Sequence, residues 1–293
     1  MISVQGLSKS YGKHRALDGL DLEVKPGEVF GYLGPNGAGK TTTIRLLLDL
    51  IRPSSGHAEV LGLDAHADSL EIRRRVGYMP GELALYEKMT GAELLKFLGR
   101  LRGPKPPSRS KELSDAMGAQ LDRPIGTLSK GNKQKIGLIQ AMMHDPELLI
   151  LDEPTSGLDP LVQHTVHGLL AQSKAEGRTV FLSSHALSEV EAIADRIAII
   201  KDGSLAAVED VQEMKARAVR RIEVRFARPV TKIAFEGLNG VDDVQITDVG
   251  ATFSVTGSVD HLIKAISSFE VTGIVTHEPD LEEIFLHYYG DGA

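Results

Sequence analysis

Short apolar runs separated by turn signals dominate the first part of the chain. Residues 17–24 alternate apolar and polar positions, a Pro-Gly pair follows, and an apolar run begins at Val29. This pattern predicts two strands around a turn. Two further short strands are expected within residues 53–62 and 76–80, where apolar residues again follow turn-forming ones.

Nearly continuous apolar strands return later and alternate with helical segments. They occupy residues 148–151, 179–184 and 196–200. Short apolar strands that alternate with helices are typical of a parallel sheet covered on both faces. The pattern therefore predicts an α/β fold.

Residues 82–145 follow a helical pattern instead. Thr90 and Glu93 are placed as a capping box, and leucines recur at helical spacing after them. A second helix is expected over 131–143. Three prolines within 102–110 exclude a helix over those residues, which we expect to form a loop.

A different pattern begins after Gly203. The expected elements are strands at 222–226, 253–255 and 273–277, a helix from about Asp260, and a final helix within 278–290 with Pro279 in its first turn. We therefore expect one domain of residues 1–214 and a small separate α+β domain of residues 215–293.

Basic residues gather at the entrance to this second domain. They are Lys215, Arg217, Arg220, Arg221 and Arg225. Two explanations stay open: a solvated face, or a contact with lipid headgroups or a membrane partner.

Composition excludes several classes of protein. The net charge of −7 argues against a dedicated nucleic-acid binder, whose affinity comes largely from neutralising phosphates. Cysteine is absent, which excludes disulfides and thiolate metal sites and suits the cytosol. The N-terminus lacks a secretory pattern, and no apolar run approaches the ~18–20 residues of a membrane span. A membrane role would therefore require a partner or a surface contact.

A phosphate loop lies between a predicted strand and a predicted helix. Gly34, Gly39, Lys40 and Thr41 fit G-x-x-x-x-G-K-[ST] in the context that this motif requires. The glycines let backbone N–H groups face phosphates, the lysine reaches the β- and γ-phosphates, and the threonine ligates Mg²⁺. A chance glycine-rich turn does not explain this combination. The expected nucleotide-binding residues are Gly34, Asn36, Gly37, Gly39, Lys40, Thr41 and Thr42.

Two carboxylates end the buried strand at 148–151. Asp152 is the candidate Mg²⁺ partner through water, and Glu153 is the candidate base for the attacking water. His185 ends another predicted strand. A histidine there is often structural, but it lies at the same sheet edge as the phosphate loop, so we expect a γ-phosphate contact.

A second anion-binding feature starts the helix expected over 131–143. Ser129 and Gly131 stand where a helix N-terminus offers free backbone N–H groups and a positive dipole end. The chain already has a better phosphate loop, so the ligand of this second site needs an explanation.

In this order, the motifs resemble the ATP-binding cassette (ABC) family over residues 2–205. The matching segments are Tyr11 in SKSYGKHRAL, the loop at 34–42, LSKGN at 128–132, LLILDE at 148–153, SGLD at 156–159, and His185. The resemblance implies a P-loop NTPase domain with a parallel core sheet, an antiparallel β subdomain and a helical subdomain at about 82–145.

The resemblance also explains the second anion site. It implies that two cassettes dimerise head to tail around two ATP molecules, so that Ser129 and Gly131 bind the γ-phosphate held by the partner. It places Asp159 across the same interface and Tyr11 against adenine, with a half-buried core tyrosine as the alternative. The helical subdomain would contact a membrane subunit.

Two departures from the family pattern concern these sites. The family's LSGGQ motif has Lys130 and Asn132 at its variable positions here. The family also carries a glutamine where this chain has Gly81, followed by Glu82. Either Glu82 replaces the glutamine as a Mg²⁺ ligand, or the contact is lost.

The C-terminal extension resembles ATPase subunits of the ABC-2-type exporter group, with dimer support or regulation as its expected role. We therefore expect a Mg²⁺-dependent ATPase that binds ATP and ADP, pairs with a second copy or a homologous subunit, and drives export through a separate transmembrane permease. It would lie on the cytoplasmic face of the membrane and bind no nucleic acid. The alternatives are a soluble ABC-type ATPase acting on DNA or ribosomes and a weakly hydrolysing nucleotide-binding module.

Overall fold

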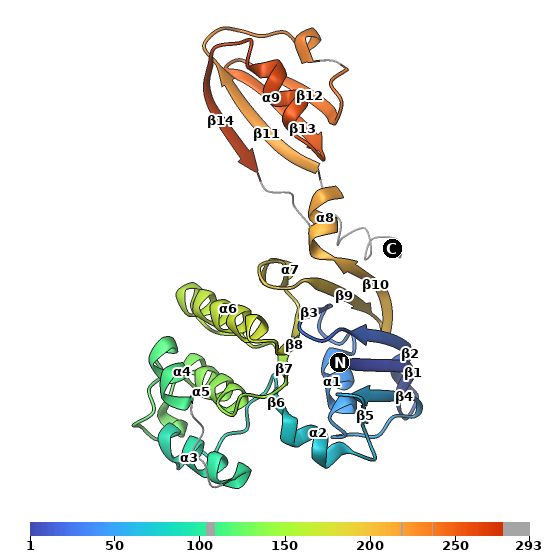
Figure 1. The fold of residues 1–293 in the computed structure, drawn as a ribbon, viewed down its shortest axis with the longest axis vertical. Coiled ribbons are helices and arrows are strands. Elements are labelled where there is room, and N and C mark those ends of the chain that lie inside the picture. Colours follow the sequence, from blue (N-terminus) through green and yellow to red (C-terminus); the bar gives the residue numbers. More distant parts are fainter. Residues whose placement is uncertain (104–108, 218, 236, 278–293) are drawn as a thin grey trace. The chain divides into compact units, whose positions relative to one another are not determined.

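The computed structural model describes residues 1–103, 109–217, 219–235 and 237–277 (Figure 1). The chain divides into two compact units, Met1–Val208 and Glu209–Ala293, whereas the sequence placed the boundary after residue 214. Two expected features lie outside the described residues. They are the prolines of the loop expected at 102–110 and the helix expected within 278–290, with Pro279.

A six-stranded sheet forms the centre of the first unit, in the order β10-β9-β3-β8-β7-β6. The strands are β3 (Val29–Leu33), β6 (Val76–Met79), β7 (Leu148–Asp152), β8 (Thr179–Ser184), β9 (Arg196–Lys201) and β10 (Ser204–Asp210). Strands β9, β3, β8, β7 and β6 pair in parallel. Every residue of β3, β7 and β8 is buried, which explains their continuous apolar sequences. The α/β prediction is confirmed.

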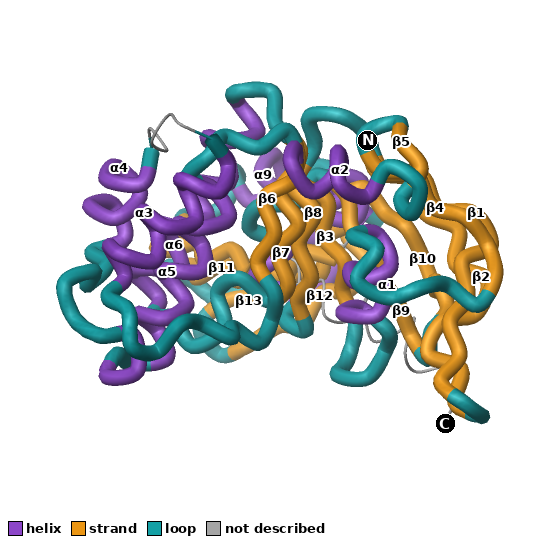
Figure 2. The backbone as a smooth tube through the Cα atoms, turned by 90° about the horizontal axis from the view of Figure 1, so that it is seen from below, coloured by secondary structure: helices purple, strands orange, loops and turns teal. Residues whose placement is uncertain are grey.

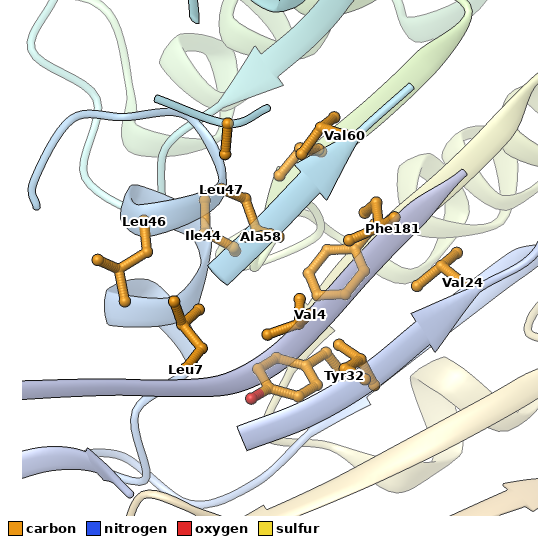
Figure 3. Close-up of a cluster of buried hydrophobic side chains, with 14 of the residues drawn as sticks. Val4, Leu7, Val24, Tyr32, Ile44, Leu46, Leu47, Ala58, Val60 and Phe181 are labelled. Atoms are coloured by element: carbon orange, nitrogen blue, oxygen red, sulfur yellow. The ribbon is translucent and has the colours of Figure 1, made fainter. Parts of the chain in front are cut away.

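An antiparallel sheet lies beside this core, in the order β2-β1-β4-β5. Its strands are β1 (Ile2–Tyr11), β2 (His14–Val24), β4 (Ser55–Val60) and β5 (Leu63–Asp64). Side chains from this sheet, from helix α1 (Lys40–Leu47) and from the central sheet share one hydrophobic core. Figure 3 shows Val4, Ile44 and Phe181 from these three sources within that core. This packing fixes α1, and with it the phosphate loop, against both sheets.

Three helices make up most of the segment between β6 and β7. They are α3 (Gly91–Arg102), α4 (Ser110–Met117) and α5 (Lys130–Met142), and they lie together at one side of the central sheet (Figure 2). The capping box of Thr90 and Glu93 is present at the start of α3. Leu94, Ile125 and Ile136 belong to a small apolar core of this helical part. Both expected helices, α3 and α5, are confirmed.

An ion-pair cluster joins this helical part to the core of the unit. Arg109, which is buried at the start of α4, lies 3.4 Å from Asp145 and 3.5 Å from Glu176, between guanidinium nitrogen and carboxylate oxygen. Arg178 contacts the same two carboxylates at 2.9 and 2.8 Å. Because Glu176 follows helix α6 (Pro160–Ala175), the cluster ties α4 to the end of α6.

The remaining helices of this unit are α2 (Ser69–Arg75) and α7 (Leu187–Glu191). Helix α7 follows β8 directly and contacts both β8 and β3. Among the described residues, no helix is long and apolar enough to cross a membrane.

The second unit contains an antiparallel sheet in the order β12-β13-β11-β14. Its elements are α8 (Val211–Arg217), β11 (Val219–Phe226), β12 (Val241–Thr247), β13 (Gly250–Thr256), α9 (Asp260–Ile266) and β14 (Val271–His277). Ile222 and Val224 face a core rich in phenylalanine, whereas Arg221 before them and Arg225 after them are exposed. Both explanations of the basic run, a solvated face and a contact with lipid headgroups or a membrane partner, require this exposure.

Candidate functional site: a phosphate loop and paired carboxylates

The phosphate loop connects the end of β3 to the start of α1. Gly34 follows the strand and donates its backbone N–H to the carbonyl oxygen of Ser184 at 3.3 Å. Gly39 has φ of +111°, and a Cβ there would lie 2.8 Å from the carbonyl oxygen of Ala16. Only glycine fits this position, because both the backbone conformation and the close approach exclude a side chain.

Lys40, the first residue of α1, is buried within this loop. Its Nζ donates to the carbonyl oxygens of Gly34 at 2.6 Å and Pro35 at 3.2 Å. Burial lowers the pKa of Lys40, and the nearby carboxylates of Glu153 and Asp152 oppose that shift. The ammonium group therefore bonds two carbonyl oxygens of the loop and lies near two carboxylates.

Asp152 lies at the C-terminal end of β7 and is buried. Its Oδ2 accepts a hydrogen bond from the Thr41 hydroxyl at 2.8 Å, and its Oδ1 accepts one from the Ser183 hydroxyl. Asp152 and Ser183 are partners in the parallel register of β7 and β8. The sheet therefore fixes this carboxylate next to the phosphate loop.

Glu153 has an unusual backbone and faces the side chains of His185 and Lys40. Its φ is +50°, in the left-handed region that residues with a side chain rarely adopt. Its Oε1 lies 3.1 Å from Nδ1 of His185 and 3.8 Å from Nζ of Lys40. The carboxylate is partly exposed, so it is open to a ligand or to water.

Three pockets meet at Glu153. The first, of about 330 Å³, is lined by Tyr11, His14, Ala16, Asn36, Gly37, Gly39, Lys40, Thr41, Thr42 and Glu153. The second, of about 380 Å³, includes Thr41, Glu82, Asp152 and Glu153 among its lining residues. The third, of about 410 Å³, includes His185 and Glu189 with Glu153. The structure thus brings together the expected loop, metal and catalytic residues.

Tyr11 lies at the end of β1, beside the phosphate loop rather than in the core. Its side chain is 47% exposed, and Nζ of Lys9 lies 5.1 Å from the ring centroid. The alternative of a half-buried core tyrosine does not describe this position. The exposed ring is available to stack on a planar ligand at the mouth of the first pocket.

Gly81 and Glu82 lie at the second pocket. A Cβ on Gly81 would lie only 3.2 Å from Oδ2 of Asp152, so Gly81 closely approaches that carboxylate. Glu82 lines the pocket and is exposed. Glu82 is therefore the acidic residue of this segment that lines the same pocket as Asp152 and Thr41.

Ser129, Gly131 and Asp159 do not line these pockets. Ser129 is the N-cap of α5, where its Oγ accepts the backbone N–H of Asn132 at 3.2 Å. Asp159 is the N-cap of α6, where its Oδ1 accepts the N–H of Val162 at 3.0 Å. In the described part of the chain, none of the three residues lines a pocket that contains Glu153. A single chain therefore does not gather all the expected residues.

Two contributors to the site were missed by the sequence analysis. Ser183 bonds Asp152 and also contacts the backbone N–H of Glu153 with its Oγ at 3.2 Å. Gln134 on α5 donates to the carbonyl oxygens of Glu153 and Pro154. A polar residue on the apolar face of a predicted helix was the available signal for Gln134.

Known proteins resemble this chain in sequence. The ABC transporter family profile matches residues 17–156. The bacitracin transport ATP-binding protein BcrA of Bacillus licheniformis is 34% identical over 304 residues, covering 100% of this chain and 98% of the relative. The linearmycin resistance ATP-binding protein LnrL of Bacillus subtilis is 32% identical over 308 residues, covering 99% and 98%.

A solved structure agrees with the fold. The dimeric ATP-binding cassette MJ0796 bound to ADP and Pi superposes with a TM-score of 0.67, covering 72% of this chain and 99% of the cassette. Its sequence identity of 23% supports the fold alone. With the full-length similarity to transporter ATP-binding proteins, the conclusion is that this chain belongs to the ABC transporter family and is one of its ATP-binding, ATP-hydrolysing subunits.

Proposed function

We propose that the chain is the Mg²⁺-dependent ATPase subunit of an exporter, that it works as a dimer, and that it drives a separate transmembrane permease. The observation that carries this proposal is the convergence of the phosphate loop, Asp152 and His185 on Glu153. Full-length similarity to a bacitracin transport protein and a linearmycin resistance protein supports the export of an antibiotic-like compound.

The residues around Asp152 fit a magnesium ion. The hydroxyl of Thr41 and the carboxylate of Asp152 are hard oxygen donors 2.8 Å apart, and Glu82 adds a second carboxylate to the same pocket. We assign the ion to Thr41 directly, to Asp152 through water, and to Glu82 in place of the family's glutamine. The ion would neutralise phosphate charge there.

The phosphates and the base of ATP would lie along the first pocket. Lys40 would exchange its bonds to the loop carbonyls for bonds to phosphate oxygens, and backbone N–H groups from Asn36 to Thr42 would contribute further donors. Tyr11, at the other side of this pocket, would stack on adenine. Exposure of its ring supports that assignment.

Hydrolysis would rest on Glu153 and His185. Glu153 would orient and deprotonate the attacking water, because its partly exposed carboxylate lies close to both Lys40 and the metal pocket. His185 would contact the γ-phosphate and hold the glutamate through its 3.1 Å contact.

The second half of each site would come from the partner chain. Ser129 and Gly131 lie at the start of α5, a 13-residue helix whose first N–H groups and dipole favour a phosphate. Since they do not reach this chain's own pockets, a second copy or a homologous subunit would bring its phosphate loop to them. Asp159 would lie at the same interface.

A separate groove fits the membrane subunit. It measures about 800 Å³ and is lined by leucines that follow α1 or lie on α2 and α3, together with Arg73, Arg74 and Arg102. Leu70 is 63% exposed and Leu101 is 69% exposed, which is unusual for large apolar side chains that are neighbours. An amphipathic segment with acidic residues, supplied by the permease on the cytoplasmic side, would match this surface.

A binding and turnover measurement tests the proposal. Purified protein should hydrolyse ATP only with Mg²⁺ present, and Glu153→Gln should retain ATP binding while lowering turnover by about 10²-fold or more. Glu87→Gln, an exposed glutamate outside the pockets, is the control. Light scattering should show ATP-dependent dimers of Glu153→Gln. Normal turnover in that variant would remove Glu153 from its role.

A further inference from the structure

The backbone of Glu153 needs external support. Its φ of +50° places a residue with a long side chain in the left-handed region, and Pro154 follows it directly. Such conformations persist only where surrounding contacts hold them, and they gather at functional sites. The contacts that hold this turn therefore determine where the Glu153 carboxylate points.

Hydrogen bonds from two directions hold the turn. On the sheet side, the N–H of Glu153 donates to the backbone oxygen and to Oγ of Ser183, each at 3.2 Å. On the opposite side, Nε2 of Gln134 donates to the carbonyl oxygen of Glu153 at 3.0 Å and to that of Pro154 at 3.1 Å. A single side-chain amide thus bonds the two peptide units on either side of Pro154, directly after the strained residue.

Gln134 is committed to this contact. It is only 3% exposed, on the buried side of α5, and its amide N–H groups match the two carbonyl oxygens. Burying an amide is unfavourable unless it is hydrogen-bonded, so packing alone does not explain a glutamine here.

The same helix begins with Ser129 and Gly131, which the proposed function places against the partner's ATP. Ser129 caps α5 five positions before Gln134. A Cβ on Gly131 would lie 3.1 Å from the carbonyl oxygen of Gly157, so the first turn of α5 packs closely on the segment that follows Glu153. Direct contacts therefore link the start of α5 to the turn at Glu153.

We propose that Gln134 is a positioning residue for hydrolysis: it holds the Glu153–Pro154 turn and couples the start of α5 to the Glu153 carboxylate of the same chain. This inference rests on the proposed function, in which Ser129 and Gly131 serve the partner's ATP and Glu153 serves the chain's own. Occupation of one ATP site would then set the geometry of the base at the other.

Gln134→Met tests the inference, because methionine keeps the size of the side chain and removes both donors. We expect kcat to fall about 10- to 100-fold, with KM and the Kd for a fluorescent ATP analogue within about threefold of wild type. Gln134→Glu, which places acceptors against two carbonyl oxygens, should lower kcat at least as much.

The control is Ile139→Val, a buried residue of the same helix that makes no side-chain hydrogen bond to the turn. It should lower the melting temperature and leave kcat unchanged. Wild-type kcat in folded Gln134→Met would overturn the inference, and so would an equal loss of kcat in Ile139→Val at a matched melting temperature. Failure of the wild-type protein to bind or hydrolyse ATP would instead overturn the proposed function, and this role with it.

Discussion

The hydroxyl of Thr41 donates a hydrogen bond to Oδ2 of Asp152 across 2.8 Å, between residues 111 positions apart in the sequence. The bond joins the first turn of α1 to the end of β7. Both elements are fixed by the buried core of the first unit, so the two oxygens are held in place before any ligand arrives. Such preorganisation is what a charged, multidentate ligand requires.

Because Ser129 does not line the pockets that contain Glu153, we predict complementation between two inactive variants. Ser129→Asp keeps a good helix cap and sets a negative charge against the partner's phosphate, while Lys40→Ala disables a chain's own phosphate loop. Each variant alone should be inactive. In an equal mixture, half of the dimers hold one intact site, so we expect at most about a quarter of the wild-type ATPase rate, and less where the coupling through Gln134 needs the second site occupied.

Heterodimer formation must be demonstrated in that mixture, for example with two different affinity tags. If tagged heterodimers form and show no activity above the separate variants, sites shared between chains are ruled out. If Ser129→Asp alone retains full activity, Ser129 does not contact phosphate.

Glu82 is expected to tune the magnesium requirement. Since its carboxylate lines the pocket of Thr41 and Asp152, Glu82→Ala should raise the Mg²⁺ concentration for half-maximal activity on the order of tenfold. Glu87→Ala, in the same segment and outside the pocket, is the control. Superimposable Mg²⁺ titrations of the Glu82 variant and wild type would exclude Glu82 as a metal-site residue.

The lowered pKa of His144 predicts that the free energy of unfolding decreases in mild acid. Burial, and then the nearby charge of Arg102, lower the pKa of His144 from 6.5 to about 4. The unfolded chain therefore binds the proton more readily than the folded one between these two values. The contribution of neutral His144 to the free energy of unfolding is complete above about pH 6.5. It is lost progressively as the pH falls toward 4.

Melting at several pH values measures this effect. From pH 7.5 to pH 5 we expect wild type to lose about 2 kcal/mol of unfolding free energy through this group. His144→Asn, which retains a donor for the carbonyl oxygen of Val76, should lose correspondingly less. Parallel pH curves for the two proteins would contradict the assignment.

The exposed leucines of the groove predict a variant that separates hydrolysis from coupling. Leu101→Glu should leave folding within about 0.5 kcal/mol of wild type, because the side chain is exposed. It should abolish co-purification with the membrane subunit and retain basal ATP binding. Val249→Glu, at an exposed apolar position of the second unit, is the control. Undiminished co-purification of Leu101→Glu would place the membrane subunit elsewhere.

Local sequence signals predicted the elements that hold the site. The phosphate loop, the strand before Asp152 and the strand before His185 are each defined by consecutive residues. β1 was missed because register shifts after Val4 and after Leu7 interrupt its alternation of apolar and polar positions. Helix α4 was missed because it spans only eight residues; its signals were Leu113 and Met117 four positions apart, and Gly118 at its end.

Contacts between distant parts of the chain could not be predicted from local sequence patterns. No spacing rule indicates that Gln134 reaches the carbonyl oxygen of Glu153, since that contact depends on how α5 packs beside β7. The same holds for Ser183, whose bond to Asp152 follows from the parallel register of two strands 31 residues apart. Sequence patterns identified the groups that carry the chemistry, and packing decided what supports them.

The left-handed backbone at Glu153 lowers the stability of the fold, whereas the carboxylate at this position serves the proposed catalysis. A residue with a side chain costs roughly 1–2 kcal/mol in that conformation, whereas glycine adopts it freely. Selection for heat resistance alone would therefore favour glycine or asparagine at this position and discard the carboxylate. Directed evolution of this subunit should accordingly screen for turnover and stability together, because one accessible stabilising change lies on the proposed catalytic base.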